Sequence, residues 1–369
     1  MAAGWTGHAA AKDDDGGRSA GDLDAAAIAR LAAWLEERIP GLTGGAVPEV
    51  TRYAGGASNW TYRLRFPELD LVLRRPPSGT KAKSAHDMAR ESQILKRLAP
   101  HYPLVPEALA YCADPAVLGS DFYVMRRIDG IILGRNPPPG LALAPAAARK
   151  LCLHFVDALV ALHRIDPKGA GLEELGRGSG YARRQVAGWT DRYRQARTGN
   201  VPRAGRLMDW LQANAPTDSG SCLIHNDFRL DNVVLDPRDP TRIVGVLDWE
   251  MATVGDPLMD LAAALAYWVE AGDDPLFRAL RRQPTQLAGM LTRREIVEAY
   301  CRGMGIPAIP AADWIFYELF GLFRLAAIAQ QIYLRYHRRE TRNPAFRHFW
   351  LYVHYLVWRC QRLLRRSGA

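Results

Sequence analysis

The spacing of apolar and polar positions changes along the chain. Residues 25–38 carry apolar side chains at helical spacing, and Pro40 and Gly41 end that predicted helix. Short runs of β-branched, aromatic and aliphatic residues then predict strands, with one further helix among them. The predicted strands cover residues 50–53, 59–66, 69–75 and 122–126, and the second helix covers residues 85–98.

Helical spacing dominates beyond residue 129. A short β insert interrupts it at residues 223–225, 233–235 and 243–247. We therefore predict an α+β protein with a bilobal, protein-kinase-like organisation. A disordered tail covers residues 1–21, a small β-rich N-lobe covers residues 22–127, and a larger, mostly helical C-lobe covers residues 128–369. Clefts between such lobes are where nucleotides usually bind.

Composition narrows the class of protein. The five cysteines lie far apart with no CxxC pair, which favours buried thiols in a reducing compartment over a disulfide framework. No targeting or membrane-spanning segment is visible, so we expect a cytoplasmic protein without a membrane partner. The net charge is +9, but the basic residues are mostly arginines spread along the chain. That spread argues against nucleic acid and suits an anionic small molecule.

The segment HNDFRLDN at residues 225–232 is the strongest chemical signal. Asp227 follows His225 by two residues and precedes Asn232 by five, which matches the HxDxxxxN catalytic loop of protein kinases and aminoglycoside phosphotransferases. Asp227 would accept the proton of an acceptor hydroxyl, and Asn232 would bind a metal ion. Arg229 stands where protein kinases often carry a lysine that meets the γ-phosphate. The alternative is a surface turn rich in Asp and Asn.

A second carboxylate follows this loop at the right place. The predicted strand at residues 243–247 delivers Asp248 at its end, where kinases carry the metal-binding aspartate of their DFG segment. An aspartate at the end of a strand is more often a cap or turn residue. Together with the preceding loop, however, Asp248 becomes a ligand candidate for Mg²⁺ bound with ATP.

The N-lobe offers groups that could hold the phosphates of ATP. Gly55 and Gly56 join two predicted strands and would let backbone N–H groups approach phosphate, although most glycine hairpins are simply turns. Arg74 lies one residue before the end of the third predicted strand, and Glu91 on the following helix is its expected partner. The alternative is a surface ion pair that contributes less than about 1 kcal/mol.

Several other polar residues are assigned structural roles. Asp256 should cap a helix that begins at Pro257, and Asp260 is a candidate brace for the loop at His225. The C-terminal helix is aromatic and basic, and we expect it to pack on the helical lobe and not on a membrane. Four histidines have spacing and surroundings that do not suit a metal site, and we interpret them as structural: His154, His163, His348 and His354.

Taken in order, these blocks resemble the aminoglycoside phosphotransferase-like and choline kinase-like kinase superfamily. The likeness is greatest to the kinase-like domain found in acyl-CoA dehydrogenase fusion proteins and to its stand-alone bacterial relatives. It runs over residues 50–352 and includes the blocks GGASNWTYRL, LVLRRPPSG, DFYVMRRIDG, LIHNDFRLDNVVL and VGVLDWEMATVGDPLMDLA.

The resemblance implies a bilobal fold, Mg·ATP as the phosphoryl donor and the hydroxyl of a small molecule as the acceptor. Asp227 would be the catalytic base, and Asn232 and Asp248 would be the metal ligands. The remaining implied contacts are to the nucleotide. They are Ser58 and Asn59 in the glycine loop with Gly55 and Gly56, Arg74 and Glu91 at the α- and β-phosphates, and Met125 and Arg126 in a connector that flanks the adenine.

Two residues depart from the superfamily pattern. The catalytic loop reads His-Asn-Asp where His-Gly-Asp is usual, so Asn226 could alter the local backbone. The strand cation is Arg74 and not lysine, and its forked geometry could change how a phosphate is positioned. The sequence does not decide whether either departure affects activity.

Three functions fit these residues. The first is a kinase of hydroxyacyl-CoA or a related metabolite, with Arg135, Arg229 and Arg324 as candidate contacts to the CoA phosphates. The second is an antibiotic phosphotransferase acting on aminoglycosides or macrolides, against which the arginine-rich, acid-poor helical lobe counts. The third is a degenerate module that binds a nucleotide without catalysis. The preference for ATP over GTP stays open, as does the oligomeric state, a homodimer included.

Overall fold

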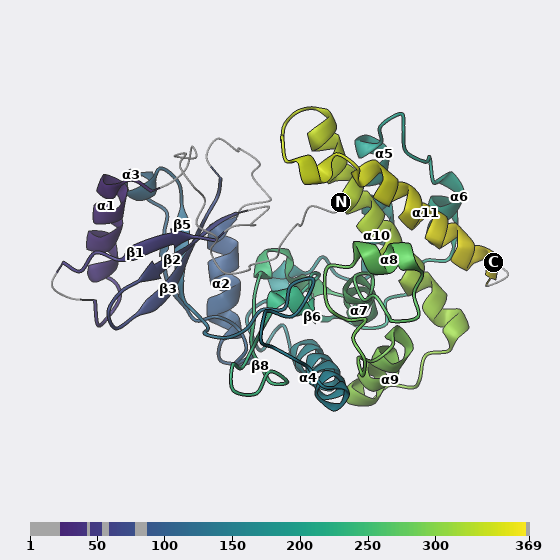
Figure 1. Cartoon of the computed structure of the whole chain (residues 1–369), viewed down its shortest axis with the longest axis horizontal. Helices are drawn as coiled ribbons and strands as arrows, with labels where there is room; N and C mark the ends of the chain where they lie inside the picture. The colour runs from purple at the N-terminus through teal and green to yellow at the C-terminus, as the bar shows by residue number, and fades with distance from the viewer. Residues whose placement is uncertain (1–22, 43–44, 54–58, 78–86, 367–369) are drawn as a thin grey trace. The chain divides into compact units, whose positions relative to one another are not determined.

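The computed structural model describes residues 23–42, 45–53, 59–77 and 87–366. Contacts divide these residues into two compact units (Figure 1). The sheet unit contains residues 23–142 and 230–252, and the helical unit contains residues 143–229 and 253–366, apart from the gaps just given. The predicted tail at residues 1–21 lies outside the described residues, as do Gly55, Gly56 and Ser58.

An antiparallel sheet forms the centre of the sheet unit. Within the described residues its strands follow the order β1-β2-β3-β5-β4. Residues 50–53, 59–66, 69–75 and 122–126 were predicted as strands, and each forms one to within a residue or so. Strand β4 was missed because its alanines and polar neighbours give little strand signal. The strands are β1 (Glu49–Arg52), β2 (Trp60–Arg65), β3 (Asp70–Arg75), β4 (Ala108–Cys112) and β5 (Phe122–Arg126).

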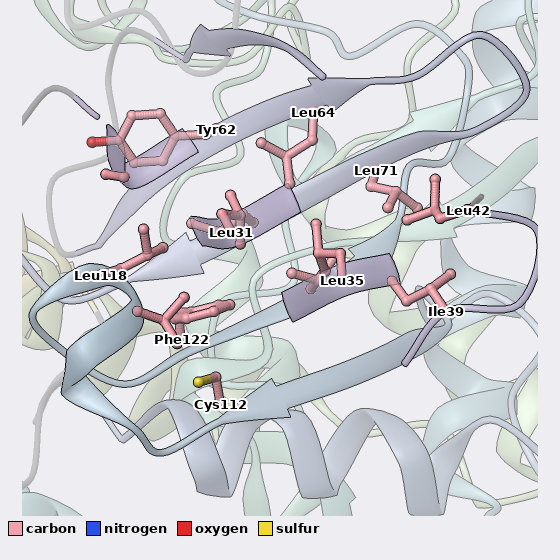
Figure 2. Packing of buried hydrophobic residues seen from close by; sticks show 14 of the residues in the cluster. Leu31, Leu35, Ile39, Leu42, Tyr62, Leu64, Leu71, Cys112, Leu118 and Phe122 are labelled. Atoms are coloured by element: carbon pink, nitrogen blue, oxygen red, sulfur yellow. The ribbon is translucent and has the colours of Figure 1, made fainter. Parts of the chain in front are cut away.

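Helix α1 (Ala25–Glu36) covers one face of this sheet. Asp24 caps its first turn by accepting a hydrogen bond of 2.7 Å from the backbone N–H of Ala27. Figure 2 shows Leu31 and Leu35 of α1 directed into a cluster with residues from several strands and from α3 (Pro115–Leu118). The cluster includes Tyr62, Leu64, Leu71, Leu118 and Phe122. This apolar layer fixes which face of each strand points inward.

The opposite sheet face carries α2 (Met88–Leu98). Side chains alternate across a strand, so Leu71 and Leu73 of β3 face the α1 cluster while Val72 and Arg74 face α2. Both faces are covered, which is why β3 is buried along most of its length. The alternation places Arg74 on the α2 side, where Glu91 lies.

A hairpin of β7 (Val233–Leu235) and β8 (Ile243–Val246) completes the sheet unit. Gly245 allows its close packing against the connector after β5, because a Cβ atom there would lie 2.5 Å from the side chain of Ile128. A bridge between Ile131 and Leu235 adds a backbone link to the same connector. The predicted insert strands at residues 233–235 and 243–247 are therefore confirmed, and they group with the sheet unit.

The helical unit is built around α10 (Ala311–His337), which packs mainly against α5 (Tyr181–Ala196), α7 (Pro257–Leu265) and α11 (Phe349–Arg366). Gly321 allows the close crossing of α10 over α7, since a Cβ atom there would lie 2.4 Å from the carbonyl oxygen of Ala262. The unit also contains α4 (Pro145–His163), α6 (Gly205–Ala213), α8 (Pro275–Leu280), α9 (Arg293–Met304) and a two-stranded sheet of β6 (Cys222–Ile224) and β9 (Thr253–Gly255).

Two sequence-based expectations concern buried groups. All five cysteines are free and buried, as predicted. Among the described residues, α10 is long and apolar enough to cross a membrane, but 72% of its apolar window is buried inside the protein. A buried window of this kind is typical of a core helix.

Candidate active site

The segment at residues 225–229 lies in the helical unit and follows β6 directly. His225 is fully buried, and its ring meets that of Phe228 edge-on at a centroid distance of 5.8 Å. Phe228 in turn packs on Phe155 of α4 at 4.8 Å. The apolar member of the motif therefore anchors the loop in the core, and the surface-turn interpretation is wrong for this part of it.

Asp260 of α7 holds the backbone of the loop. One carboxylate oxygen accepts the N–H of His225 at 2.8 Å, and the other accepts the N–H of Asn226 at 2.7 Å. The predicted brace is thus confirmed. Asp256 caps α7 by accepting the N–H of Met259 at 2.9 Å, and Pro257 occupies the first turn, as predicted.

A buried relay supports Asp260 from behind. Nε2 of His163 lies 3.1 Å from the Asp260 carboxylate, and its Nδ1 lies 2.6 Å from the hydroxyl of Tyr300. Because the carboxylate can only accept, Nε2 donates to it and Nδ1 faces the tyrosine. Burial alone would raise the pKa of Asp260, but the hydrogen bond from His163 and the loop N–H groups outweigh burial and hold that pKa below its ordinary value.

The departure at Asn226 has a clear structural basis. Its φ angle is +64°, in the left-handed region where glycine is the default residue and asparagine is among the better tolerated alternatives. Three side chains fix it there. Besides Asp260, Arg324 donates to its carbonyl oxygen at 2.7 Å, and the hydroxyl of Tyr181 donates to its Oδ1 at 3.1 Å. The side chain of Asn226 therefore adds a contact that glycine cannot make.

The structure brings the two predicted catalytic residues together. Nε of Arg229 lies 3.2 Å from a carboxylate oxygen of Asp227. The guanidinium of Arg229 also stacks on the ring of Tyr267 at 4.5 Å, which limits the directions it can take. A carboxylate held beside a fixed cation, on a loop whose backbone is clamped, can accept a proton next to a phosphoryl group.

The predicted phosphate-binding pair lies in the sheet unit. Nη1 of Arg74 donates to Glu91 at 2.7 Å, and the two side chains are only 10% and 2% exposed. The surface-pair interpretation is therefore wrong. Nη2 of Arg74 also lies 3.1 Å from Asp248 and 3.6 Å from Glu250. Burial would lower the pKa of Arg74, but these three carboxylates raise it well above its ordinary value, so the cation stays charged.

The β7–β8 hairpin brings the two predicted metal ligands to one end. Val233 pairs with Val246, and the N–H of Leu247 donates to the carbonyl oxygen of Asn232 at 2.7 Å. Asp248 follows at once, with a left-handed φ of +70°. An aspartate tolerates this conformation better than most side chains, and it turns the chain sharply where the carboxylate is placed.

These two residues fit a magnesium ion held partly by a nucleotide. Asn232 and Asp248 offer an amide and a carboxylate oxygen, which are hard donors, and the Asp248 side chain is 35% exposed. Groups of three or more His, Cys, Asp or Glu side chains suited to a metal are absent from the described part of the chain. Mg²⁺ commonly takes one or two protein ligands and completes its shell with phosphates and water, so this small donor set suits it.

Sequence reasoning missed two residues of this cluster. Glu250 accepts a hydrogen bond of 3.0 Å from the side chain of Asn59, one of the predicted nucleotide-loop residues. Arg90 of α2 donates to the backbone carbonyl oxygens of Glu250 and Ala252. The only sequence signal for Glu250 is its place two residues after Asp248. Arg90 has no sequence signal of its own, because the expected ion pair on this helix involves its neighbour Glu91.

The connector residues are part of the sheet. Met125 is buried and pairs with Val72 of β3. Arg126 is exposed, its side chain contacts Glu107 at 2.8 Å, and its backbone N–H donates to the carbonyl oxygen of Glu107. The structure thus positions both residues through sheet pairing.

Comparisons with known proteins agree with this arrangement. Residues 49–296 match the model of the phosphotransferase enzyme family. Acyl-CoA dehydrogenase family member 10 of Mus musculus is 38% identical over 305 residues, which cover 82% of this chain but only 28% of that relative. The resemblance to acyl-CoA dehydrogenase fusion proteins is thereby confirmed.

Solved structures confirm the protein-kinase-like fold. A Ralstonia eutropha JMP134 protein, provisionally classed as an aminoglycoside phosphotransferase, is 26% identical, with a TM-score of 0.76 and coverage of 91% of this chain and 98% of that one. A thermostable mutant of the aminoglycoside phosphotransferase APH(4)-Ia, in ternary complex with AMP-PNP and hygromycin B, is 16% identical to this chain with a TM-score of 0.59. It covers 92% of this chain and 98% of its own. At that identity the second likeness concerns the fold alone.

Proposed function

The chain belongs to the phosphotransferase enzyme family, and we propose that it transfers the terminal phosphoryl group of Mg·ATP to a hydroxyl group of a small-molecule metabolite. Membership makes it a kinase with a hydroxyl acceptor. The more detailed proposal rests on one observation in each unit: the clamped loop that carries Asp227 and Arg229, and the hairpin that presents Asn232 and Asp248 at one end.

Asp227 is proposed as the general base. Its loop is held through the backbone by Asp260 and Arg324, so the backbone at Asp227 is fixed without the help of its carboxylate. Arg229, oriented by Tyr267, would offset negative charge on the transferring phosphoryl group. Electrostatic positioning of this kind supplies most of the catalysis in phosphoryl transfer.

Asn232 and Asp248 are proposed to hold Mg²⁺. When bound, the ion neutralises charge on the phosphate oxygens of ATP. The partly exposed carboxylate of Asp248 and the amide of Asn232, at one end of the hairpin, support the assignment. Asp248 is paired with Arg74, so binding of phosphates and metal at this carboxylate would require these charges to rearrange.

The nucleotide is proposed to be held by the N-lobe, residues 22–127, with catalysis and acceptor binding in residues 128–369. Arg74, braced by Glu91, would contact the α- and β-phosphates. The contact between Asn59 and Glu250 links the end of the predicted glycine loop to the segment after Asp248. The connector at Met125 and Arg126 would flank the adenine.

A hydroxyacyl-CoA is the favoured acceptor. The match to an acyl-CoA dehydrogenase family member supports it, as does the arginine-rich composition of the helical unit, which suits an anionic substrate. Arg324 is one of the three arginines suggested as CoA contacts. It is buried and donates to the carbonyl oxygen of Asn226, so its role is structural. An antibiotic acceptor, which would be cationic, is the second candidate.

A coupled assay of ATP consumption tests this proposal. Purified protein with Mg·ATP would be screened against 2-, 3- and 4-hydroxyacyl-CoAs, beside aminoglycosides and macrolides. We expect turnover with hydroxyacyl-CoA and a phosphorylated product detected by mass spectrometry. Turnover with the antibiotics alone would favour the second candidate. Nucleotide binding without turnover of any acceptor would favour a degenerate module and contradict the kinase assignment.

A further inference from the structure

An open hollow lies at the C-terminal end of α10, apart from every residue assigned above. Its volume of about 470 Å³ falls within the range of roughly 300–1,000 Å³ typical of small-ligand pockets. The last turn of α10 and the segment after it supply the whole lining. The lining residues are Tyr333, Tyr336, His337, Arg339, Thr341 and Arg342.

The floor of this hollow is rigidly built. Tyr333 is only 7% exposed, and its hydroxyl accepts a hydrogen bond of 3.0 Å from the side chain of Asn200. Asn200 is itself held, because its side-chain oxygen accepts from the hydroxyl of Thr198 at 2.7 Å and its carbonyl oxygen contacts Nε2 of His354 at 2.8 Å. The ring of Tyr333 therefore has a fixed orientation before any ligand arrives.

The rim of the hollow is positively charged. Residues 335–348 contain five arginines and one acidic residue, Glu340, whose carboxylate lies 3.9 Å from Arg338. Arg339 and Arg342 line the hollow, and neither makes an ion pair with a carboxylate among the residues that the structure describes. The C-terminal end of a helix carries a partial negative charge, which a cation in the last turn offsets. Arg335 already supplies such a cation in α10, so Arg339 and Arg342 are not needed for this purpose.

Aromatic rings beside forked cations indicate a particular ligand chemistry. Bases stack on aromatic side chains, and arginine binds phosphate through paired hydrogen bonds. Tyr333 and His337 lie on one face of the helix with ring centroids 5.9 Å apart. We propose that the hollow binds a nucleoside phosphate, with the base against Tyr336 and His337 and the phosphate on Arg339, Arg342 and Thr341.

The position of the hollow suggests the source of that nucleotide. Helix α10 carries Arg324 at the catalytic loop and His337 at the hollow, and thirteen residues of helix span about 20 Å. Helix α5 contacts the stretch of α10 between these points, since Trp189 lies near Arg324 and the Ala196 carbonyl oxygen accepts from Gln330, about two turns before His337. A CoA thioester carries its phosphorylated nucleotide and its acyl group at opposite ends of a long arm. Resting on the proposed function, the hollow takes the nucleotide end of the acceptor.

Calorimetry with adenosine 3′,5′-bisphosphate tests the hollow itself. The full chain would be titrated with saturating Mg·AMP-PNP present, so that the phosphoryl-donor site does not compete. The double variant Arg339→Gln/Arg342→Gln should bind about tenfold more weakly or worse, because two charged hydrogen bonds are lost. A matched control, Arg335→Gln/Arg347→Gln, removes the same charge from the same segment outside the hollow and should change affinity by less than about twofold.

Further titrations distinguish the nucleotide end of a CoA thioester from a free nucleotide as the ligand of the hollow. Tyr336→Ala should weaken the bisphosphate without affecting inorganic phosphate. AMP that binds as tightly as the bisphosphate would assign the hollow to a free nucleotide and overturn the acceptor-end interpretation. Equal affinity of the wild type and the Arg339/Arg342 double variant would overturn the site altogether, as would inorganic phosphate binding as well as the nucleotide.

A kinetic arm connects the hollow to catalysis. With hydroxyacyl-CoA as acceptor, the Arg339→Gln/Arg342→Gln variant should raise the KM for the acceptor several-fold and leave the KM for ATP unchanged. With the matching hydroxyacyl-pantetheine, which lacks the nucleotide, wild type and variant should behave alike. If neither acceptor is turned over, the proposed acceptor is wrong, and the calorimetric result still decides whether the hollow binds nucleotides.

Discussion

The candidate functional residues form two groups, one in each unit, and the two groups are held in different ways. In the sheet unit, the functional side chains bind one another: Arg74 contacts Glu91 and Asp248, and Glu250 contacts Asn59. In the helical unit, buried side chains bind the backbone of the loop around Asp227. The carboxylate of Asp227 takes no part in those bonds and contacts Arg229. The first arrangement can exchange partners, and the second is preorganised.

This difference fits the tasks proposed for the two groups. Triphosphate and metal bring several charges, and the ion pairs of Arg74 with the partly exposed Asp248 and Glu250 can be exchanged for contacts with them, while the buried Glu91 keeps its bond to Arg74. A general base must instead stand in one place relative to the acceptor, because a small displacement weakens proton transfer strongly. Substitutions should therefore affect the two groups differently.

The largest expected effect is at Asp227. Asp227→Asn keeps the shape of the side chain but removes its basicity, and we expect turnover to fall by about 10³-fold. The melting temperature should change little, since Asp260 and Arg324 hold the loop through its backbone. Turnover would be measured by coupled ATP consumption and melting by calorimetry. Asp209→Asn, on the exposed face of α6, is the control, and near-normal turnover in Asp227→Asn would refute the base assignment.

The next effect concerns the metal. Asp248→Asn removes a charged ligand while tolerating the left-handed backbone, and it should raise the Mg²⁺ concentration needed for half-maximal nucleotide binding on the order of tenfold. Asn232→Ala should act in the same direction. Titration of Mg²⁺ into protein with a fluorescent ATP analogue measures this without relying on turnover. Glu68→Ala, an exposed carboxylate of the sheet unit, should leave the requirement unchanged; nucleotide binding that ignores Mg²⁺ in the wild type would contradict both assignments.

The third prediction addresses the buried brace. Asp260→Asn places an amide where two backbone N–H groups and His163 all donate, and we expect it to lower the free energy of unfolding by about 3 kcal/mol. Asp256→Asn, one turn earlier, keeps most of its capping bonds and should cost about 1 kcal/mol. Urea unfolding at pH 7 measures both, and equal costs would argue against a special role for Asp260.

The contribution of Asp260 to the free energy of unfolding should also depend on pH. The pKa of Asp260 is held below its ordinary value in the folded protein, so its stabilisation is present above about pH 4 and is lost as the pH falls through the folded pKa. The difference in unfolding free energy between wild type and Asp260→Asn should therefore be constant from pH 7 to about pH 5 and should shrink below about pH 4. A difference that grew on acidification would contradict the sign of the pKa shift.

Substitution of Asn226 should affect stability less than substitution of Asp260. Asn226→Ala keeps the positive φ but loses both the tolerance of asparagine and the bond from Tyr181, and it should destabilise the protein by about 1–2 kcal/mol. Asn226→Gly relieves the backbone and should lie within about 1 kcal/mol of the wild type. Tyr181→Phe removes only the side-chain bond and serves as the control. A glycine variant as unstable as the alanine variant would show that the Tyr181 contact, and not the backbone conformation, supplies most of the stabilisation at this position.

Much of the fold could be predicted because the local patterns agree with it. The helical spacing of α1 follows from its one buried face, and the apolar run of β3 follows from burial on both faces; burial is the strongest local signal. Strand β4 was missed because Ala108 and Ala110 carry little strand preference, and its pairing with β5 decides its conformation. Strand β9 was missed for a similar reason, since it is three residues long and is defined by pairing with β6.

The site was predicted in part. Asp227, Asn232 and Asp248 stand in a recognisable spacing, so their residue types were enough to single them out. Glu250 and Arg90 were missed because they act through contacts with residues far away in the chain, such as Asn59. The relay from Tyr300 through His163 to Asp260 joins three helices, and spacing within a single helix gives no sign of it.

The sequence by itself determined the order of elements, the candidate base and ligands, and the phosphotransferase chemistry, because short-range spacing fixes which groups share a loop or a strand. Only the tertiary structure decided that Arg74 and Glu91 are buried, that Asn226 adopts a left-handed conformation, and that a charged aromatic hollow ends α10. These features depend on contacts between residues distant in the chain. Their energies come from burial and from partners that no local pattern specifies.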